Sequence, residues 1–321
     1  MSDFPTLLFI PGSWHKPSCY DKITNVLESQ YNFQCISVTL PSTTGNPAAT
    51  FKDDLDIARD AISTETSQGR NVVVIAHSYG GMVGNSAIKG FTAPDVSITT
   101  AETQSSTTAP GHVIGLILIA SGFTMTGLSF MDPFFGHPPP FWRVNSETGF
   151  AELVTSPREL FYHDLPEPEA EFWTSQLTTQ SLKALFEGGE HAYAGWLDVP
   201  VWYIGTVEDR GLPVLVQRMQ VGMAREMGYS VEHRELQSSH SPFLSLPEET
   251  VRIVDAIGAV MGKSAGSGLG ISGDGLMLPK SDFWRPSTWF RFGVPLVVGH
   301  VVGRFVLLFL GARRLWRSRS A

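Results

Sequence analysis

A serine at position 78 lies where the sequence changes from an apolar strand pattern to a helix pattern. The run Val72-Val-Val-Ile75 ends just before it, and small residues stand two positions away on either side, at Ala76 and Gly80. A serine in such a sharp strand-to-helix turn exposes its hydroxyl at the carboxyl end of a sheet. The N-terminus of the following helix favours the negative charge of a reacting oxygen. The pattern predicts a nucleophile at Ser78; the alternative is a simple turn of small residues.

A nucleophilic serine needs a general base, and the base needs an orienting acid. Among nine histidines, His240 lies in a loop between the last expected strand and the last helix of the body, at the same sheet edge as Ser78. Asp209 directly follows the expected strand at 199–204. The chain order serine, aspartate, histidine is the order expected with such a turn. Glu208 is the alternative acid, and His77 is expected to point along the turn.

The reaction also needs two N–H donors for the oxygen that becomes negatively charged. One candidate is the backbone N–H of Tyr79, which follows the serine. The other is Ser13, in the loop Pro11-Gly-Ser-Trp-His15 after the first expected strand, where Gly12 lets the loop turn back over Ser78. We therefore expect Ser13 and Tyr79 to form an oxyanion hole.

The composition argues against nucleic-acid binding, a disulfide framework and a metal site. The 321 residues carry a formal net charge of −8, which argues against a nucleic-acid-binding protein. The two cysteines, Cys19 and Cys35, cannot form a disulfide framework. Neither cysteine belongs to a metal-spaced pair, and no His–Glu or His–Cys spacing indicates a metal site. We expect no nucleotide, flavin or metal cofactor.

Short apolar runs alternate with longer helix patterns along the chain. The expected strands are Phe4–Ile10, Gln34–Val38, Val72–Ile75, Val113–Ile119, Val199–Ile204 and Ser230–Glu235. The expected helices lie near 18–29, 50–67, 80–89, 212–227 and 247–261. Two of the strands are apolar at successive positions, as central parallel strands covered on both faces are. The pattern predicts an α/β fold with a mainly parallel six-stranded sheet and helices on both faces.

Residues 123–195 interrupt the alternation and are too long for one crossover. They hold 13 of the 35 Phe, Trp and Tyr residues of the chain. Long insertions between strands are commonly active-site lids, so we expect a helical cap over an apolar pocket. The alternative is an extra helical layer with its own core. The catalytic domain is expected to span 1–262, with this cap inside it.

Together these motifs resemble the α/β-hydrolase superfamily, in particular the compact branch of plant methyl esterases, hydroxynitrile lyases and related microbial esterases. The resemblance covers about residues 4–261. It rests on Pro11-Gly-Ser-Trp-His15, Ala76-His-Ser-Tyr-Gly-Gly81, and Glu208-Asp209 with His240-Ser-Pro-Phe-Leu-Ser245. It implies that Ser78 is the nucleophile, His240 the base and Asp209 the acid, with Ser13 and Tyr79 as oxyanion donors.

Two positions depart from the family pattern. Pro11-Gly12 replaces the His-Gly of the family's oxyanion loop, and Ser241 stands where the lyases carry a lysine that handles cyanide. The second departure favours hydrolysis of an ester, thioester or lactone of a small apolar molecule, in a role such as secondary metabolism. Two alternatives remain: acyl transfer, cyclisation or C–C cleavage on the same triad, and a non-catalytic fold that binds a small ligand.

The C-terminal segment differs from the body. Residues 263–321 carry nine Lys or Arg and two Asp or Glu, and 263–283 read as a flexible linker. The 19 residues Phe292–Leu310 contain one charge, Arg304, and four arginines follow them. We expect 284–321 to hold a single membrane-spanning helix; the alternative is a helix packed on the body or on a second copy.

The N-terminus does not match a signal peptide. Met1-Ser2-Asp3 carries no basic residue, and the apolar stretch Leu7–Ile10 runs directly into Pro11-Gly12. We therefore expect the catalytic domain to be cytoplasmic, anchored to a membrane by the C-terminal helix.

Overall fold

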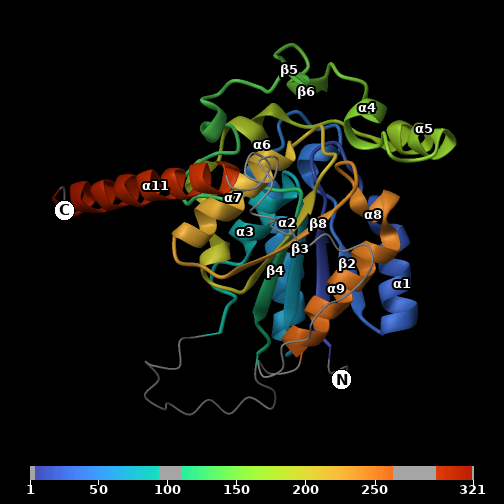
Figure 1. The fold of residues 1–321 in the computed structure, drawn as a ribbon, viewed down its shortest axis with the longest axis horizontal. Helices are drawn as coiled ribbons and strands as arrows, with labels where there is room; N and C mark the ends of the chain where they lie inside the picture. The colour runs from blue at the N-terminus through green and yellow to red at the C-terminus, as the bar shows by residue number, and fades with distance from the viewer. Residues whose placement is uncertain (1–3, 94–109, 263–293, 320–321) are drawn as a thin grey trace.

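A six-stranded parallel sheet forms the centre of the protein in the computed structural model, which describes residues 4–93, 110–262 and 294–319 (Figure 1). The strand order is β2-β1-β3-β4-β7-β8, and all neighbouring pairs run parallel. The strands are β1 (Thr6–Ile10), β2 (Gln34–Ser37), β3 (Val72–His77), β4 (Val113–Ile119), β7 (Val201–Thr206) and β8 (Val231–Leu236). All six strands overlap the ranges expected from the sequence, so the predicted fold class is confirmed.

Helices cover both faces of the sheet, which explains why β3 is buried along its whole length. The main helices are α1 (Asp21–Tyr31), α2 (Phe51–Ser67), α3 (Gly80–Ala87), α7 (Val214–Glu226), α8 (Pro242–Ser245) and α9 (Pro247–Gly262). Helix α1 packs against α9 and α8, while α2 packs against α3. Because every strand of the sheet is parallel, the loops that follow the carboxyl ends gather at one edge, and they carry the predicted site residues.

Residues 123–195 form an insertion between β4 and β7, and Figure 1 shows its labelled elements beyond the end of the sheet. Its elements are β5 (Trp142–Asn145), β6 (Phe150–Leu153), α4 (Pro157–Phe161), α5 (Glu167–Gln176) and α6 (Leu182–Phe186). Strands β5 and β6 pair antiparallel as a hairpin that the sequence did not predict. Each strand has four residues, too few to establish a period.

The C-terminal segment corrects one prediction. Helix α11 (Val294–Arg319) overlaps the expected membrane segment from residue 294 onward, yet within the described ranges no helix is both long and apolar enough to span a bilayer. The membrane-spanning helix predicted within Phe292–Leu310 is therefore wrong, and the membrane anchor that it implied is not supported. The expected linker 263–283 lies outside the described residues.

Helix α11 instead packs along α7. A Cβ at Gly299 would lie 2.2 Å from the carbonyl oxygen of Met219, so the two helix backbones touch there. The Nε of Arg304 donates to Glu226 Oε1 at 2.9 Å. A charge inside the segment lowers its apolarity, and in this structure that charge has a partner on the body.

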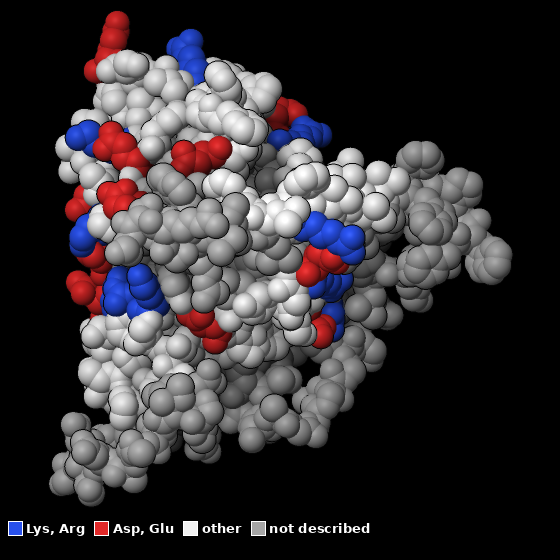
Figure 2. Space-filling model, turned by 90° about the vertical axis from the view of Figure 1, so that its left-hand side faces the viewer, with Lys and Arg blue, Asp and Glu red and all other residues white. Residues whose placement is uncertain are grey.

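Charges of both signs share the surface. On the face drawn in Figure 2, described acidic and basic side chains lie next to one another, and much of the area between them is uncharged. The described side chains on this face do not form a continuous basic surface of the kind with which proteins bind nucleic acid.

Candidate active site

Ser78 occupies a left-handed turn between β3 and α3, with φ of 52°. This conformation is rare outside glycine and costs on the order of 1–3 kcal/mol, so the surroundings must hold it. The backbone N–H of Ser78 donates to Ile119 O at 3.1 Å, and Ser121 Oγ donates to Ser78 O at 2.6 Å. Both partners belong to β4 or its end, so the neighbouring strand fixes the turn.

The small residues beside Ser78 are required by close packing. A Cβ at Gly80 would lie 2.4 Å from Pro11 O, and one at Gly81 would lie 1.8 Å from Ser121 Oγ. A Cβ at Gly12 would lie 2.9 Å from Ser78 Cβ. The loop after β1 therefore rests directly on the serine turn. That contact places Gly12, the residue before Ser13, beside Ser78, and the oxyanion hole of Ser13 and Tyr79 stays a prediction.

His240 and Asp209 are joined at the carboxyl edge of the sheet. The Nδ1–H of His240 donates to Asp209 Oδ2 at 2.7 Å, and both residues are buried. A carboxylate only accepts hydrogen bonds, so the proton lies on Nδ1 and the Nε2 of a neutral ring carries the lone pair. That tautomer can accept a proton.

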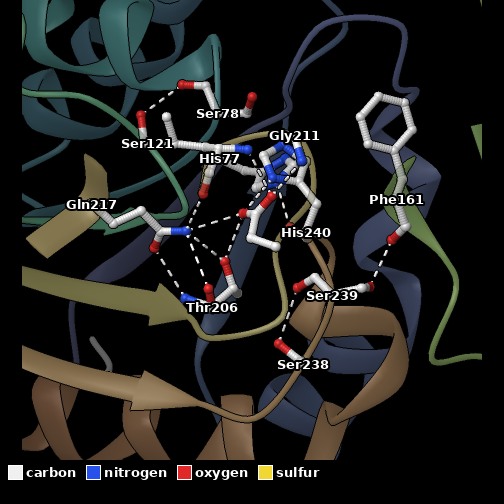
Figure 3. A network of polar contacts seen from close by, with 12 residues as sticks. His77, Ser78, Ser121, Phe161, Thr206, Gly211, Gln217, Ser238, Ser239 and His240 are labelled. Atoms are coloured by element: carbon white, nitrogen blue, oxygen red, sulfur yellow. Dashed lines mark hydrogen bonds and ion pairs between the residues drawn. The ribbon is translucent and has the colours of Figure 1, made fainter. Parts of the chain in front are cut away.

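Further donors surround the Asp209 carboxylate, among them Thr206, Gly211 and Gln217, which Figure 3 labels. Its Oδ1 accepts from the backbone N–H groups of Gly211 at 2.8 Å and Leu212 at 2.7 Å. Its Oδ2 also accepts from Thr206 Oγ1 at 2.7 Å and from Gln217 Nε2 at 3.1 Å. These contacts fix the carboxylate that orients His240. Sequence reasoning missed Thr206 and Gln217, because no motif links a residue of α7 to a loop before it.

The alternative acid, Glu208, is exposed, and its Oε1 accepts from Gln237 Nε2 at 2.6 Å. The geometry thus favours Asp209 as the partner of His240. Among the hydrogen bonds of the described residues, none joins Ser78 Oγ to His240. Such bonds often tighten only when substrate is bound.

His77 links the serine turn to the histidine loop. Its ring is buried, its centroid lies 4.6 Å from that of His240, and its Nε2–H donates to His240 O at 2.9 Å. Burial lowers the pKa of His77 well below its usual value, so the ring is neutral. The sequence suggested only that His77 would not face the serine hydroxyl; its contact with the backbone of His240 was not foreseen.

The insertion contacts the loops that carry the acid and the base. Ser239 Oγ donates to Phe161 O at 2.7 Å, and the Ser239 N–H donates to Asp164 Oδ2 at 2.7 Å. The Phe161 ring lies 5.5 Å from the His240 ring, centroid to centroid. His163 Nε2 donates to Glu208 O at 2.9 Å. The segment after α4 therefore packs on both loops.

Comparison with known proteins now identifies the family. The model of the alpha/beta hydrolase family matches residues 7–253, about three quarters of the chain. The chain belongs to the alpha/beta hydrolase family. The match begins in β1 and ends in α9, so it includes every predicted site residue, and the resemblance stated from the motifs is confirmed.

Individual proteins similar to this hydrolase are also hydrolases or share its fold. The alpha/beta hydrolase nvfD of Aspergillus novofumigatus is 25% identical over 253 residues, covering 78% of this chain and 95% of that protein. The structure of a pyrethroid hydrolase from Sphingobium faniae has a TM-score of 0.59 at 21% identity, covering 81% of this chain and 98% of the other. The structure of tomato methylketone synthase I, complexed with 2-tridecanone, has a TM-score of 0.62 at 13% identity. It covers 81% of this chain and 99% of the other. At these identities the solved structures support the fold.

The side chain of Tyr79 anchors the residue after the hydrolase's serine. Its hydroxyl donates to Asp54 Oδ2 at 2.7 Å, and the other carboxylate oxygen accepts from the Ser42 N–H at 2.8 Å. Burial raises the pKa of Asp54 to about 6. This contact fixes Tyr79 from helix α2 and was not apparent from the sequence.

A cavity of about 660 Å³ opens beside the loop after β1. None of its lining residues is a predicted site residue; they are Lys16, Pro17, Ser18, Thr39, Thr43, Thr44, Gly45, Thr178 and Thr179. In the described part of the chain, no group of three or more His, Cys, Asp or Glu residues could hold a metal ion.

Proposed function

We propose that this hydrolase cleaves a carboxylic ester, thioester or lactone of a small apolar molecule through an acyl-enzyme on Ser78. The observation that carries the proposal is the buried 2.7 Å bond between His240 Nδ1 and Asp209, at the sheet edge where Ser78 sits in its left-handed turn. We infer that the catalytic unit comprises residues 1–262, because the family match lies within them.

Each group has a role in the proposed reaction. His240 Nε2 takes the proton of the Ser78 hydroxyl as its oxygen attacks the carbonyl carbon, and the carbonyl oxygen becomes an anion. The backbone N–H groups of Ser13 and Tyr79 stabilise that anion. His240 then gives the proton to the leaving oxygen or sulfur. A water molecule, deprotonated by His240, attacks the acyl carbon and releases the acid, restoring Ser78.

Aromatic rings packed against the side chains of two site residues support an apolar substrate. Phe161 packs near His240, and the Phe130 ring lies 5.4 Å from that of Tyr79, centroid to centroid. Both phenylalanines come from the insertion, which supports the proposal that the insertion is an apolar cap. A relative of the same fold is complexed with 2-tridecanone, an apolar molecule.

The test is turnover of p-nitrophenyl esters of rising acyl chain length by the wild type, Ser78→Ala and Ser175→Ala. Ser175 is a matched control, since it lies on α5 and its hydroxyl donates to Phe172 O. We expect Ser78→Ala to lose at least about 10⁴-fold in kcat and Ser175→Ala to match the wild type. Equal turnover by Ser78→Ala and the wild type would contradict the proposal.

A further inference from the structure

The loop that carries Ser13 contains a second strained residue, Trp14. The Ser13 backbone is part of a tight turn in which the His15 N–H donates to Gly12 O at 3.3 Å. Trp14 takes the third position of this turn with φ of 62°. Turns with a left-handed third residue favour glycine there, and a bulky side chain in that conformation is an outlier. Something outside the turn must stabilise it.

The insertion supplies the contacts that hold Trp14. Its indole Nε1–H donates to Ala151 O in β6 at 3.0 Å, and its ring lies 6.5 Å from that of Trp142 in β5. The Phe161 ring of α4 lies 6.2 Å away. The backbone of the same residue is also held, because Trp14 O accepts from Thr178 N at 2.8 Å and Thr178 Oγ1 at 3.0 Å.

His15, the next residue, is held by the insertion as well. Its Nδ1–H donates to Ser13 O at 2.7 Å, and its Nε2 accepts the Tyr162 hydroxyl proton at 2.8 Å. A carbonyl only accepts, so these two bonds fix the tautomer. The ring is buried, and burial lowers its pKa to about 4, so it is neutral at pH 7. A chain of hydrogen bonds therefore runs from Tyr162 through His15 to the peptide that follows Ser13.

From these contacts we infer that Trp14 and His15 are positioning residues through which the insertion sets the oxyanion hole. The insertion thus does more than cover a pocket: it holds the turn in which the Ser13 N–H points at the reacting oxygen, and Gly12 presses that turn onto Ser78. This inference rests on the proposed function, since it assigns a source of geometry to the Ser13 donor.

Two conservative variants with matched controls test it in the full chain. Trp14→Phe removes the bond to Ala151 and keeps an aromatic ring, and Trp173→Phe is its control, because Trp173 donates only to Glu169 within α5. Tyr162→Phe removes the bond to His15, and Tyr193→Phe is its control, because Tyr193 donates to Asp198.

Kinetics on the best p-nitrophenyl ester should separate positioning from binding. Removing an oxyanion donor outright costs about 10²–10³ in kcat, so loosening one should lower kcat by roughly 5- to 50-fold. KM should stay within about twofold, because the loss falls on the transition state. The affinity for a trifluoromethyl ketone, which forms the tetrahedral anion, should fall in parallel with kcat, while that for the matching methyl ketone should not.

Trp14→Gly separates strain from anchoring. Glycine adopts the left-handed conformation freely but offers no indole to the insertion. We expect this variant to lose at least as much kcat as Trp14→Phe; wild-type kcat in Trp14→Gly would overturn the inference.

The remaining outcomes are also decisive. If Trp14→Phe and Tyr162→Phe fold with wild-type melting temperatures and keep wild-type kcat and trifluoromethyl ketone affinity, the insertion does not set the oxyanion hole, while the proposed function stands. If the wild type turns over no ester and binds no trifluoromethyl ketone, the proposed function fails and this inference fails with it.

Discussion

Ser78 and Trp14 are both non-glycine residues in the left-handed region, yet different parts of the chain hold them. Ser78, with φ of 52°, is fixed by the sheet, through Ile119 and Ser121 at the end of β4. Trp14, with φ of 62°, is fixed by the insertion, through Ala151 and Thr178. The hydrolase therefore has a sheet-held side and an insertion-held side to one site.

Because the sheet holds Ser78 and the insertion holds Trp14, the two residues depend on parts of the chain that differ in how freely their sequence can vary. Strands of a buried parallel sheet change little without loss of the core, so the proposed nucleophile, Ser78, is held by the fold itself. The sequence of an insertion varies more readily among related proteins than the sequence of a sheet does. On the proposal made above, an oxyanion loop anchored to the insertion links the part that would shape the pocket to the part that would stabilise the transition state.

The largest effect is expected on the sheet-held side, at Asp209. Asp209→Asn replaces the carboxylate that accepts from His240 Nδ1 and disfavours the tautomer that can act as base, so kcat/KM should fall by roughly 10⁴-fold. Glu208→Gln is the control, because this exposed neighbour does not contact His240, and it should stay within about threefold. A larger loss in Glu208→Gln than in Asp209→Asn would reverse the assignment of the acid.

The insertion-held side should respond to pH through His15. Its pKa, lowered to about 4 by burial, lies below the unfolded value of 6.5, so the unfolded chain binds more protons between these values. The contribution of His15 to stability is present above pH 6.5 and is lost as the pH falls towards 4. It amounts to on the order of 3 kcal/mol.

Urea unfolding at pH 7 and pH 4 measures this contribution of His15 to the free energy of unfolding. His15→Asn should lose about 3 kcal/mol less between the two pH values than the wild type does. His191→Asn, at a half-buried position of the insertion, is the control for the substitution itself. Parallel curves for His15→Asn and the wild type would mean that His15 is not buried as a neutral ring.

A smaller effect is expected where the two sides meet, at Gly80. The added Cβ of Gly80→Ala would lie 2.4 Å from Pro11 O and 2.5 Å from Ile10 O, both backbone atoms that cannot turn away. The free energy of unfolding should fall by about 2 kcal/mol. In Gly122→Ala the nearest atom, 3.0 Å away, belongs to the Gln220 side chain, so its loss should be smaller. Equal stability of Gly80→Ala and the wild type would show that the loop does not rest on the turn.

The smallest effect on catalysis is expected outside both sides, in α11. Gly299→Leu places a side chain where α11 touches Met219, so the helix should separate from α7. Trypsin should then cleave faster within α11, while kcat/KM stays within about twofold. Val301→Leu, on the exposed face of α11, is the control. A loss of activity in Gly299→Leu alone would mean that α11 supports the site through α7.

The sequence predicted the sheet-held side well, for physical reasons. Continuous apolar runs identify β3 and β4, because strands covered on both faces have no polar side. The small residues around Ser78 mark a turn with no space for side chains. Asp209 and His240 follow strands directly, and parallel strands end at one edge. Each of these signals is local in the chain.

The insertion-held side could not be predicted in the same way. The left-handed turn at Trp14 depends on Ala151 and Thr178, which lie more than a hundred residues later and belong to no motif. Nothing in Trp14 itself indicates positive φ, which the sequence would suggest only for glycine or asparagine. The bond from Gln217 to Asp209 could not be predicted either, because no motif links the two residues.

The C-terminal segment shows how composition alone misleads. Its apolar residues and flanking arginines matched a membrane span, but apolarity does not say what a helix packs against. Gly299 and Gly303 lie on the face that meets α7, and Arg304 pairs with Glu226. Small residues at such spacing allow two helices to approach closely in any surroundings.

The central claim, that Ser78 is the nucleophile of a sheet-held site, is tested most directly by its covalent chemistry. Wild type and Ser78→Ala would be treated with a fluorophosphonate, and the adduct located by mass spectrometry of the intact chain and its peptides. The account predicts one adduct, on the peptide containing Ser78, and none in Ser78→Ala. An equal adduct in both proteins, or none in an ester-active wild type, would contradict it.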